Sequence, residues 1–383
     1  MQFFLTFLSL ALAFRTASAA AVSSRALPGF VQTNGTRFSL DGQKYTVVGA
    51  NAYWISLAGL SNKDLDKSFS DIASMGATSV RVWGHNEMSE QYIYPAGIVY
   101  QIWSGNKAKV NYGENGLGYF DRVIASARKH NLRLIVALTS NYNQDYITGG
   151  INTYIKQVLG RDEFHEVFFT NSEIKSAYKS YVTAVVERYK EEATILSWEL
   201  GHHLKCSVSW HPYNPKCSTE AITSWIQEMS SHIKTIDPNH LVAVGDEGFY
   251  NREGNSRWIY NGRDGIDFEA NIALKSIDYG TFAYRPESYE LRNTEEPLQW
   301  IEEHGKSQAR AGKPVVLADI GLEIRESWLD KVVSSGIAGT LYWQAGSDGI
   351  SLNMPFWFHG DSISTASTAY VNLRKHAEAL KKQ

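Results

Sequence analysis

A regular alternation of short β-type runs with longer amphipathic stretches constrains the fold most strongly. Eight runs rich in β-branched and apolar residues lie at 45–49, 78–84, 132–140, 195–200, 241–245, 278–284, 314–321 and 339–346. Several are apolar almost throughout, which is typical of strands buried on both faces of a parallel sheet. Helix-like stretches separate them, at 64–75, 118–130, 172–191, 219–236 and 296–311. This alternation predicts an α/β fold of the (β/α)8 TIM barrel type.

An open, doubly wound sheet is the alternative architecture, but it usually has fewer strands. Its dinucleotide-binding form carries a Gly-x-Gly-x-x-Gly turn after the first strand. No such turn follows the run at 45–49. No linker or low-complexity segment divides the chain after its N-terminus. We therefore expect residues 21–383 to form one barrel domain.

The composition excludes several classes of function. The 383 residues are 43% hydrophobic with a formal net charge of −3, which argues against disorder and gives no basic surface for nucleic acid. No stretch after the N-terminal run is apolar enough to cross a membrane. The 11 Trp, 21 Tyr and 16 Phe residues favour a cleft with flat apolar faces, which suits sugar rings.

The N-terminus is typical of a secretory signal peptide. Residues 3–14 are an apolar run too short to span a bilayer, and small residues suited to cleavage follow at 16–20. We expect residues 1–20 to be removed and the protein to be extracellular. The triplet Asn34-Gly35-Thr36 is then a glycosylation sequon, and Cys206 and Cys217 are expected to form a disulfide.

In a TIM barrel, chemistry takes place at the carboxyl ends of the strands. The residues at those ends are therefore the candidates for function. They are Arg81 and Trp83; Glu199, His202 and His203; Asp246 and Glu247; Ala283 and Arg285; Asp319; and Trp343.

Six short motifs at these strand ends occur in the same order in one family. They are residues 46–54 (TVVGANAYW), 81–84 (RVWG), 198–201 (WELG), 245–248 (GDEG), 280–282 (GTF) and 342–344 (YWQ). Together they resemble the secreted fungal endo-β-1,4-mannanases of glycoside hydrolase family 5, from about Phe30 to Ala377. The resemblance implies a TIM barrel, a monomer, no cofactor, and β-mannan or another oligosaccharide as partner. No metal site is expected either, because the spacing of His202, His203, Cys206, His211 and Cys217 fits no standard zinc pattern.

The resemblance also locates the two catalytic carboxylates of this retaining family, and both positions differ here. The family has Asn and the acid/base Glu where this chain has His202 and His203. The nucleophilic Glu corresponds to Asp319, which is one methylene shorter. A misplacement of about 1 Å can cost roughly 100-fold in rate, and loss of general acid catalysis costs about 10²–10⁴-fold.

Two further differences fall on the sixth strand. A sugar-facing His of the family is Ala283 here, and a Tyr beside the nucleophile is Arg285. The resemblance implies that Arg81 holds the nucleophile and that Trp343 is the floor under the sugar. We expect Trp54 and Trp83 to be further aromatic platforms for a carbohydrate.

Three functional hypotheses follow. In the first, the protein binds carbohydrate in its aromatic cleft with little or no mannanase activity, as a pseudoenzyme. In the second, His202, His203 and Asp319 perform non-hydrolytic acid/base chemistry on a small, biosynthetic molecule. In the third, weak endo-β-1,4-mannosidase activity persists, with His203 as proton donor and Asp319 as nucleophile.

Overall fold

The computed structural model describes residues 29–93, 97–142, 149–206, 217–321, 323–350 and 362–383. The predicted signal peptide, residues 1–20, lies outside the described residues. Among those described, no helix is both long and apolar enough to cross a bilayer.

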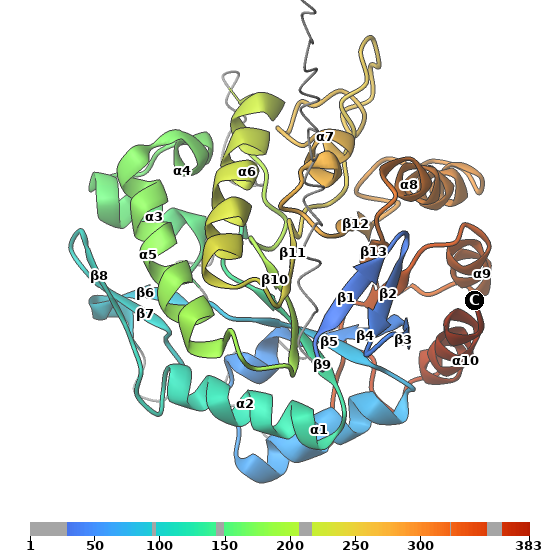
Figure 1. Cartoon of the computed structure of the whole chain (residues 1–383), viewed down its shortest axis with the longest axis horizontal. Helices are drawn as coiled ribbons and strands as arrows, with labels where there is room; N and C mark the ends of the chain where they lie inside the picture. Colours follow the sequence, from blue (N-terminus) through green and yellow to red (C-terminus); the bar gives the residue numbers. More distant parts are fainter. Residues whose placement is uncertain (1–28, 94–96, 143–148, 207–216, 322, 351–361) are drawn as a thin grey trace, which may run out of the picture.

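Eight parallel strands form the centre of the molecule, and helices surround them (Figure 1). The strands are β4 (Val47–Asn51), β5 (Ser79–Trp83), β9 (Arg133–Ala137), β10 (Ile195–Glu199), β11 (Leu241–Ala243), β12 (Gly280–Tyr284), β13 (Val315–Ile320) and β14 (Gly339–Tyr342). Each falls within or beside one of the eight predicted runs. The sheet order is β11-β10-β9-β5-β4-β14-β13-β12, so β11 and β12 are the two ends of one curled sheet.

These two ends meet through individual hydrogen bonds, and the barrel is thereby nearly closed. The backbone N–H of Asp278 donates to the carbonyl of Val242 (2.8 Å), and the N–H of Val242 donates to the Asp278 carboxylate (2.7 Å). Near the opposite end of β12, the N–H of Ala283 donates to the carbonyl of Glu247 (3.2 Å). The predicted TIM barrel is confirmed.

The five predicted helices are present, and three of them begin directly after a residue whose side chain caps the first turn. They are α1 (Asn62–Ser74), α2 (Leu117–Lys129), α5 (Ser172–Tyr189), α6 (Thr219–Ile236) and α8 (Glu296–Ala311). The side chains of Ser61, Asn171 and Ser218 accept hydrogen bonds from the first turns of α1, α5 and α6. The remaining helices are α3 (Ile151–Leu159), α4 (Glu166–Thr170), α7 (Phe268–Ala273), α9 (Glu326–Ser334) and α10 (Ala369–Lys382).

Two small sheets add to the barrel. The first is β1 (Val31–Asn34), β2 (Arg37–Leu40) and β3 (Gln43–Tyr45), and the second is β6 (Glu87–Ser89), β7 (Gln101–Ser104) and β8 (Lys107–Val110). Val31 and Phe38 of the first sheet pack with Ile135 of β9 and with Tyr279, which directly precedes β12. Asn34 is the exposed last residue of β1, directly before the turn to β2.

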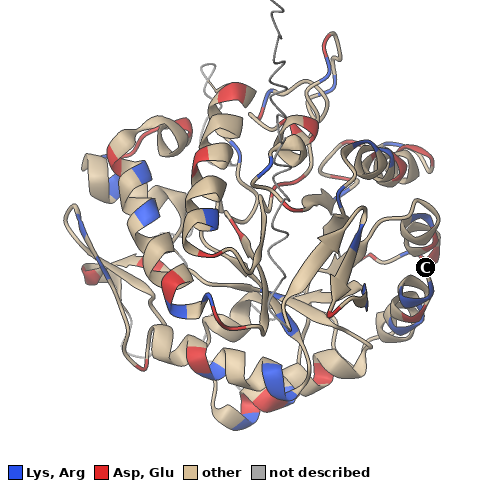
Figure 2. Cartoon of the chain, in the orientation of Figure 1, with Lys and Arg blue, Asp and Glu red and all other residues tan. Residues whose placement is uncertain are grey.

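Charged residues are concentrated on the surrounding helices and loops, whereas the barrel strands carry few of them (Figure 2). Arg81, Glu199 and Asp319 are exceptions within strands β5, β10 and β13, and all three are buried. A buried charge is costly unless it is paired. The three buried charged residues therefore indicate where in the barrel a functional site is to be sought.

Candidate active site at the strand ends

Arg81 and Glu199 form a buried ion pair inside the barrel mouth. Nε and Nη2 of Arg81 lie 2.6 and 2.5 Å from Oε2 of Glu199, and both side chains are only 1% exposed. Burial raises the pKa of Glu199, and the charge of Arg81 acts against that rise. Nη1 of Arg81 also approaches Oδ1 of Asn51 (3.3 Å). The pair thus joins the carboxyl ends of β4, β5 and β10.

Arg81 also determines the state of His202. Its Nη1 lies 2.7 Å from Nδ1 of His202, and because a guanidinium can only donate, Nδ1 must be the acceptor. His202 is therefore a neutral ring with its proton on Nε2. Burial, together with the positive charges of neighbouring groups, holds its pKa well below the usual range.

His203 lies between two carboxylates. Its Nε2 is 3.5 Å from Oδ2 of Asp319, and its Nδ1 is 3.8 Å from Oε1 of Glu247 and 3.4 Å from the Tyr142 hydroxyl. The ring stacks on His202 with centroids 3.9 Å apart. Burial lowers the pKa of His203, although both carboxylates act in the opposite direction. The backbone of His203 has φ of 56°, a left-handed conformation that is uncommon outside glycine.

Asp319 is paired with Arg285 as well as facing His203. Nη2 of Arg285 lies 2.5 Å from Oδ2 of Asp319, which is the same oxygen that faces His203. Burial would raise the pKa of Asp319, but Arg285 and His203 lower it to about 2. The carboxylate is therefore ionised at all ordinary pH values and is held by a cation.

A second cation, Lys205, neutralises Glu247. Its ammonium group contacts Oε2 of Glu247, and the Tyr289 hydroxyl donates to Oε1 (3.3 Å). Burial opposes ionisation of Glu247, yet Lys205 and His203 lower its pKa below the ordinary value. His203 is thus flanked by two anions, each of which has its own cation.

The aromatic residues at the mouth differ in their environments. Trp343 is partly exposed and stacks against Tyr53, with centroids 5.2 Å apart and planes within 9°. Trp83 is buried and packs against Tyr53 (4.7 Å) and His202 (5.5 Å). Trp54 is 2% exposed, and its indole N–H donates to the carbonyl of Ala345 (2.9 Å).

The structure brings most of the predicted site residues together at one end of the barrel. Through direct contacts, it connects Arg81, Trp83, His202, His203, Arg285, Asp319 and Trp343. Trp54 occupies a packing position beneath the mouth, so this ring is not available as an exposed platform. Ala283 is buried in β12, and its carbonyl accepts from the indole of Trp300 (3.0 Å).

The sequence did not single out three residues of this site. Lys205 follows His203 by two positions, and a lysine so close to a strand end was a usable signal. Tyr142 lies in a loop and Tyr53 begins the short 3-10 helix Tyr53–Ser56, and neither segment has a periodicity that indicates the direction of a side chain. Glu247 was named only as one of the strand-end residues, and the structure shows that it forms an ion pair with Lys205 beside His203.

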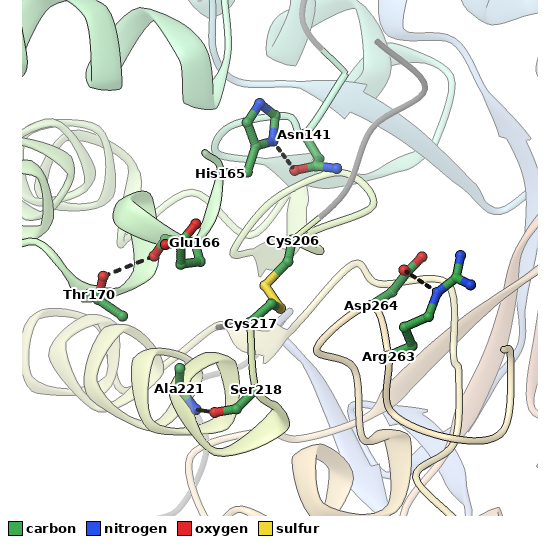
Figure 3. Close-up of a disulfide and its surroundings, with 10 residues drawn as sticks. All are labelled: Asn141, His165, Glu166, Thr170, Cys206, Cys217, Ser218, Ala221, Arg263 and Asp264. Carbon is green, nitrogen blue, oxygen red and sulfur yellow. Dashed lines mark hydrogen bonds and ion pairs between the residues drawn. A yellow bond between two sulfur atoms is a disulfide. The ribbon is translucent and has the colours of Figure 1, made fainter. Parts of the chain in front are cut away.

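The predicted disulfide is confirmed and holds the segment next to the site. Cys206 and Cys217 are bonded, with Cα atoms 6.0 Å apart (Figure 3). Cys206 directly follows Lys205, and Cys217 directly precedes Ser218, whose hydroxyl caps α6. The bond therefore attaches the chain after His203 to the start of α6.

Comparison with known proteins agrees with this barrel and its strand-end motifs. The GH family 5 β-mannosidase-like family model matches residues 28–347. A probable mannan endo-1,4-β-mannosidase A of Aspergillus flavus is 35% identical over 332 residues, which are 85% of this chain and 82% of the relative. Mannan endo-1,4-β-mannosidase A of Hypocrea jecorina is also 35% identical, over 88% of this chain and 76% of its own.

A solved structure is similar as well. The endo-1,4-β-mannanase of Rhizomucor miehei superposes with a TM-score of 0.83 at 33% identity, covering 92% of this chain and 100% of the mannanase. The family model alone spans far more than half of the chain. This chain therefore belongs to the β-mannosidase-like group of glycoside hydrolase family 5.

Proposed function

We propose that this protein is a secreted, non-hydrolysing member of its family that binds mannose-containing oligosaccharide at the barrel mouth. The observation that carries the proposal is the contact between His203 and Asp319. Nε2 of His203 lies 3.5 Å from Oδ2 of Asp319. In a retaining glycosidase, the two catalytic carboxyl groups are about 5–5.5 Å apart and flank the scissile bond. A contact this short leaves no space for an anomeric carbon between the two groups.

The charges at the site support the same conclusion. Asp319 is ion-paired with Arg285 at 2.5 Å, so its negative charge is already compensated. A nucleophile held in this way is a weak one, because it must leave its cation in order to attack. Burial lowers the pKa of His203, and this disfavours the protonated ring that would have to act as the acid toward a glycosidic oxygen.

The mouth still offers a surface for a sugar. Trp343 is partly exposed, and the guanidinium of Arg285 lies 5.8 Å from the centre of its ring. The Arg285 side chain is 31% exposed, whereas the Asp319 carboxylate with which it pairs is buried. An aromatic face beside a hydrogen-bond donor suits a pyranose ring. The relatives are mannan endo-1,4-β-mannosidases, which makes mannan oligosaccharide the first ligand to test.

Secretion is part of the proposal. The N-terminal apolar run, the exposed sequon at Asn34 and the Cys206–Cys217 disulfide support it. N-terminal sequencing of the protein recovered from culture medium checks it. Recovery inside the cell with residues 1–20 retained would contradict it.

Calorimetric titration with mannohexaose tests the binding function, with cellohexaose as the comparison sugar. We expect wild-type protein to bind mannohexaose and Trp343→Ala to bind it about tenfold more weakly, since an aromatic contact contributes up to about 1.5 kcal/mol. Tyr112→Ala is the matched control, because Tyr112 is a 56% exposed aromatic residue outside the site. Absence of mannohexaose binding to the wild type would overturn the proposal.

A second candidate function rests on the position of His203 between two anions. A neutral ring with Glu247 on one nitrogen and Asp319 on the other has the arrangement of a proton carrier. Acid/base chemistry on a small molecule would use this arrangement. Mass-spectrometric comparison of metabolites from hosts expressing wild type and His203→Ala tests it. A metabolite that changes only with the wild type would favour this candidate, and identical profiles would exclude it.

A further inference from the structure

A hollow lies beside the strand-end site that contains His203 and Asp319. This hollow, of about 720 Å³, is formed by the segment after β12, the start of α8, the segment after β13 and the start of α9. Its size falls within the range of small-molecule binding sites, about 300–1,000 Å³. All of its lining residues belong to the described part of the chain. The closed centre at His203 and Asp319 is not part of its lining.

One buried residue of this hollow has an unused hydrogen-bonding group. Tyr284 lines the hollow and is 1% exposed, and its hydroxyl has no hydrogen-bond partner among the described residues. Its ring packs edge-to-face on Trp328, with centroids 4.8 Å apart. Buried hydroxyls in proteins are nearly always paired, and an unpaired one calls for an explanation. Burial also raises the pKa of Tyr284, so the group keeps its proton and remains able to donate.

The hollow is lined by three basic and three acidic residues, Arg285, Arg292, Arg325, Glu287, Glu295 and Glu323, so its formal charges balance. Arg285 is paired with Asp319, and the Nε of Arg325 donates to Glu323 (2.8 Å). The guanidinium of Arg325 also lies 4.9 Å from the centre of the Trp328 ring. The hollow therefore presents apolar rings and hydrogen-bonding groups without a strong field of either sign. A neutral ligand rich in hydroxyl groups fits this lining better than an anion or a cation.

We propose that this hollow is a second saccharide-binding site, which takes the end of a neutral oligosaccharide whose hydroxyl pairs with Tyr284. The inference rests on the proposed function, because it assumes that the protein binds mannose-containing sugars. Arg285 connects the two places, since it contacts Asp319 and Trp343 and also lines the hollow. A sugar chain lying on Trp343 can pass over Arg285 into the hollow without entering the closed centre.

Tyr284→Phe is the sharpest variant, because it removes only the hydroxyl. We expect its affinity for mannohexaose to fall about three- to tenfold, as for loss of one buried hydrogen bond, while its Tm stays equal or rises. A merely structural hydroxyl would lower Tm when removed without changing affinity, and that result would overturn the inference. Tyr370→Phe, which removes a hydroxyl from α10, is the matched control and should leave affinity unchanged.

A filling variant and a mapping experiment complete the test. Ser327→Trp places a large ring in the hollow and should lower mannohexaose affinity at least about tenfold. Hydrogen–deuterium exchange of the wild type with mannohexaose should show protection at 285–297 and 323–328. Protection confined to the region of Trp343, with full affinity in Tyr284→Phe and Ser327→Trp, would overturn this inference and leave the proposed function standing. Absence of binding to the wild type would overturn both.

Discussion

Two arginine–carboxylate pairs lie at the barrel mouth, and they differ in depth and in partners. Arg81 and Glu199 are both 1% exposed, and Arg81 also contacts Asn51 and His202. Arg285 is 31% exposed, whereas its partner Asp319 is completely buried. The first pair joins three strand ends and supports the barrel. The second pair has one member, Arg285, within reach of solvent.

This difference separates two parts of the site. Arg81 is buried and pairs with a carboxylate that is equally buried. Asp319 is contacted by Arg285, which solvent reaches, and by His203. Arg81 and Glu199 are therefore the supporting half of the site, and Arg285 and Asp319 are its rim pair.

Arg81→Met tests the comparison with the largest expected effect. Loss of Arg81 leaves Glu199 as a buried, unpaired charge, and we expect about 3–5 kcal/mol of destabilisation in urea unfolding. Arg285→Met is the matched variant, and about 1–3 kcal/mol is expected because solvent reaches that position. Equal losses of unfolding free energy in the two variants would contradict the distinction between the buried Arg81–Glu199 pair and the partly exposed Arg285–Asp319 pair.

The Cys206–Cys217 disulfide extends the supporting half, since it fixes the chain after His203. Double replacement by Ala should cost about 2–3 kcal/mol, the range for a short closed loop. Urea unfolding with and without a reductant measures this. If the reductant lowers the stability of the double variant as much as that of the wild type, the bond does not supply this stability.

Asp246 offers a third case, a buried carboxylate that has amide donors but no cation. It accepts from the N–H of Gly248 and the amide of Asn271, both at 3.2 Å, and burial raises its pKa to about 7. The folded state therefore holds a proton that the unfolded chain releases near pH 4. Stability is full below that pH and is lost as the pH rises through 7.

We expect the wild type to lose about 2 kcal/mol from this group between pH 5 and pH 8. Asp246→Asn cannot ionise, so its unfolding free energy should change less over the same range. Urea unfolding at four pH values measures both profiles. Parallel profiles would show that Asp246 does not titrate in this range.

The fold was predictable because its signal is repeated. Eight apolar runs and five amphipathic stretches correspond to barrel strands and helices in the structure. The small sheets and helices α3, α4, α7, α9 and α10 were not predicted. All of these elements except α10 are short, and α10 follows the last barrel strand, outside the strand–helix alternation on which the prediction rested. The sheet β1–β2–β3 packs against the end of the barrel opposite the site, a tertiary role that a sequence pattern does not encode.

The site was predictable as a set of residues but not as a set of contacts. Strand ends identified His203, Arg285 and Asp319, and the structure places them in one chain of interactions. The direct contact between His203 and Asp319 depends on where the backbone places these two residues. The spacing of residues in the sequence does not determine this. The role of the Tyr284 hydroxyl could not be predicted, because a sequence does not show that a buried hydroxyl lacks a hydrogen-bond partner. Among the described residues, this hydroxyl has none.

Release of reducing ends from mannohexaose, measured side by side for wild type and Asp319→Ala, tests the central claim most directly. We predict no difference between the two proteins, because the contact between His203 and Asp319 closes the place of the scissile bond. A variant that restores the family residues, His202→Asn, His203→Glu, Ala283→His, Arg285→Tyr and Asp319→Glu, is expected to gain hydrolysis. Hydrolysis by the wild type that disappears in Asp319→Ala would contradict the claim.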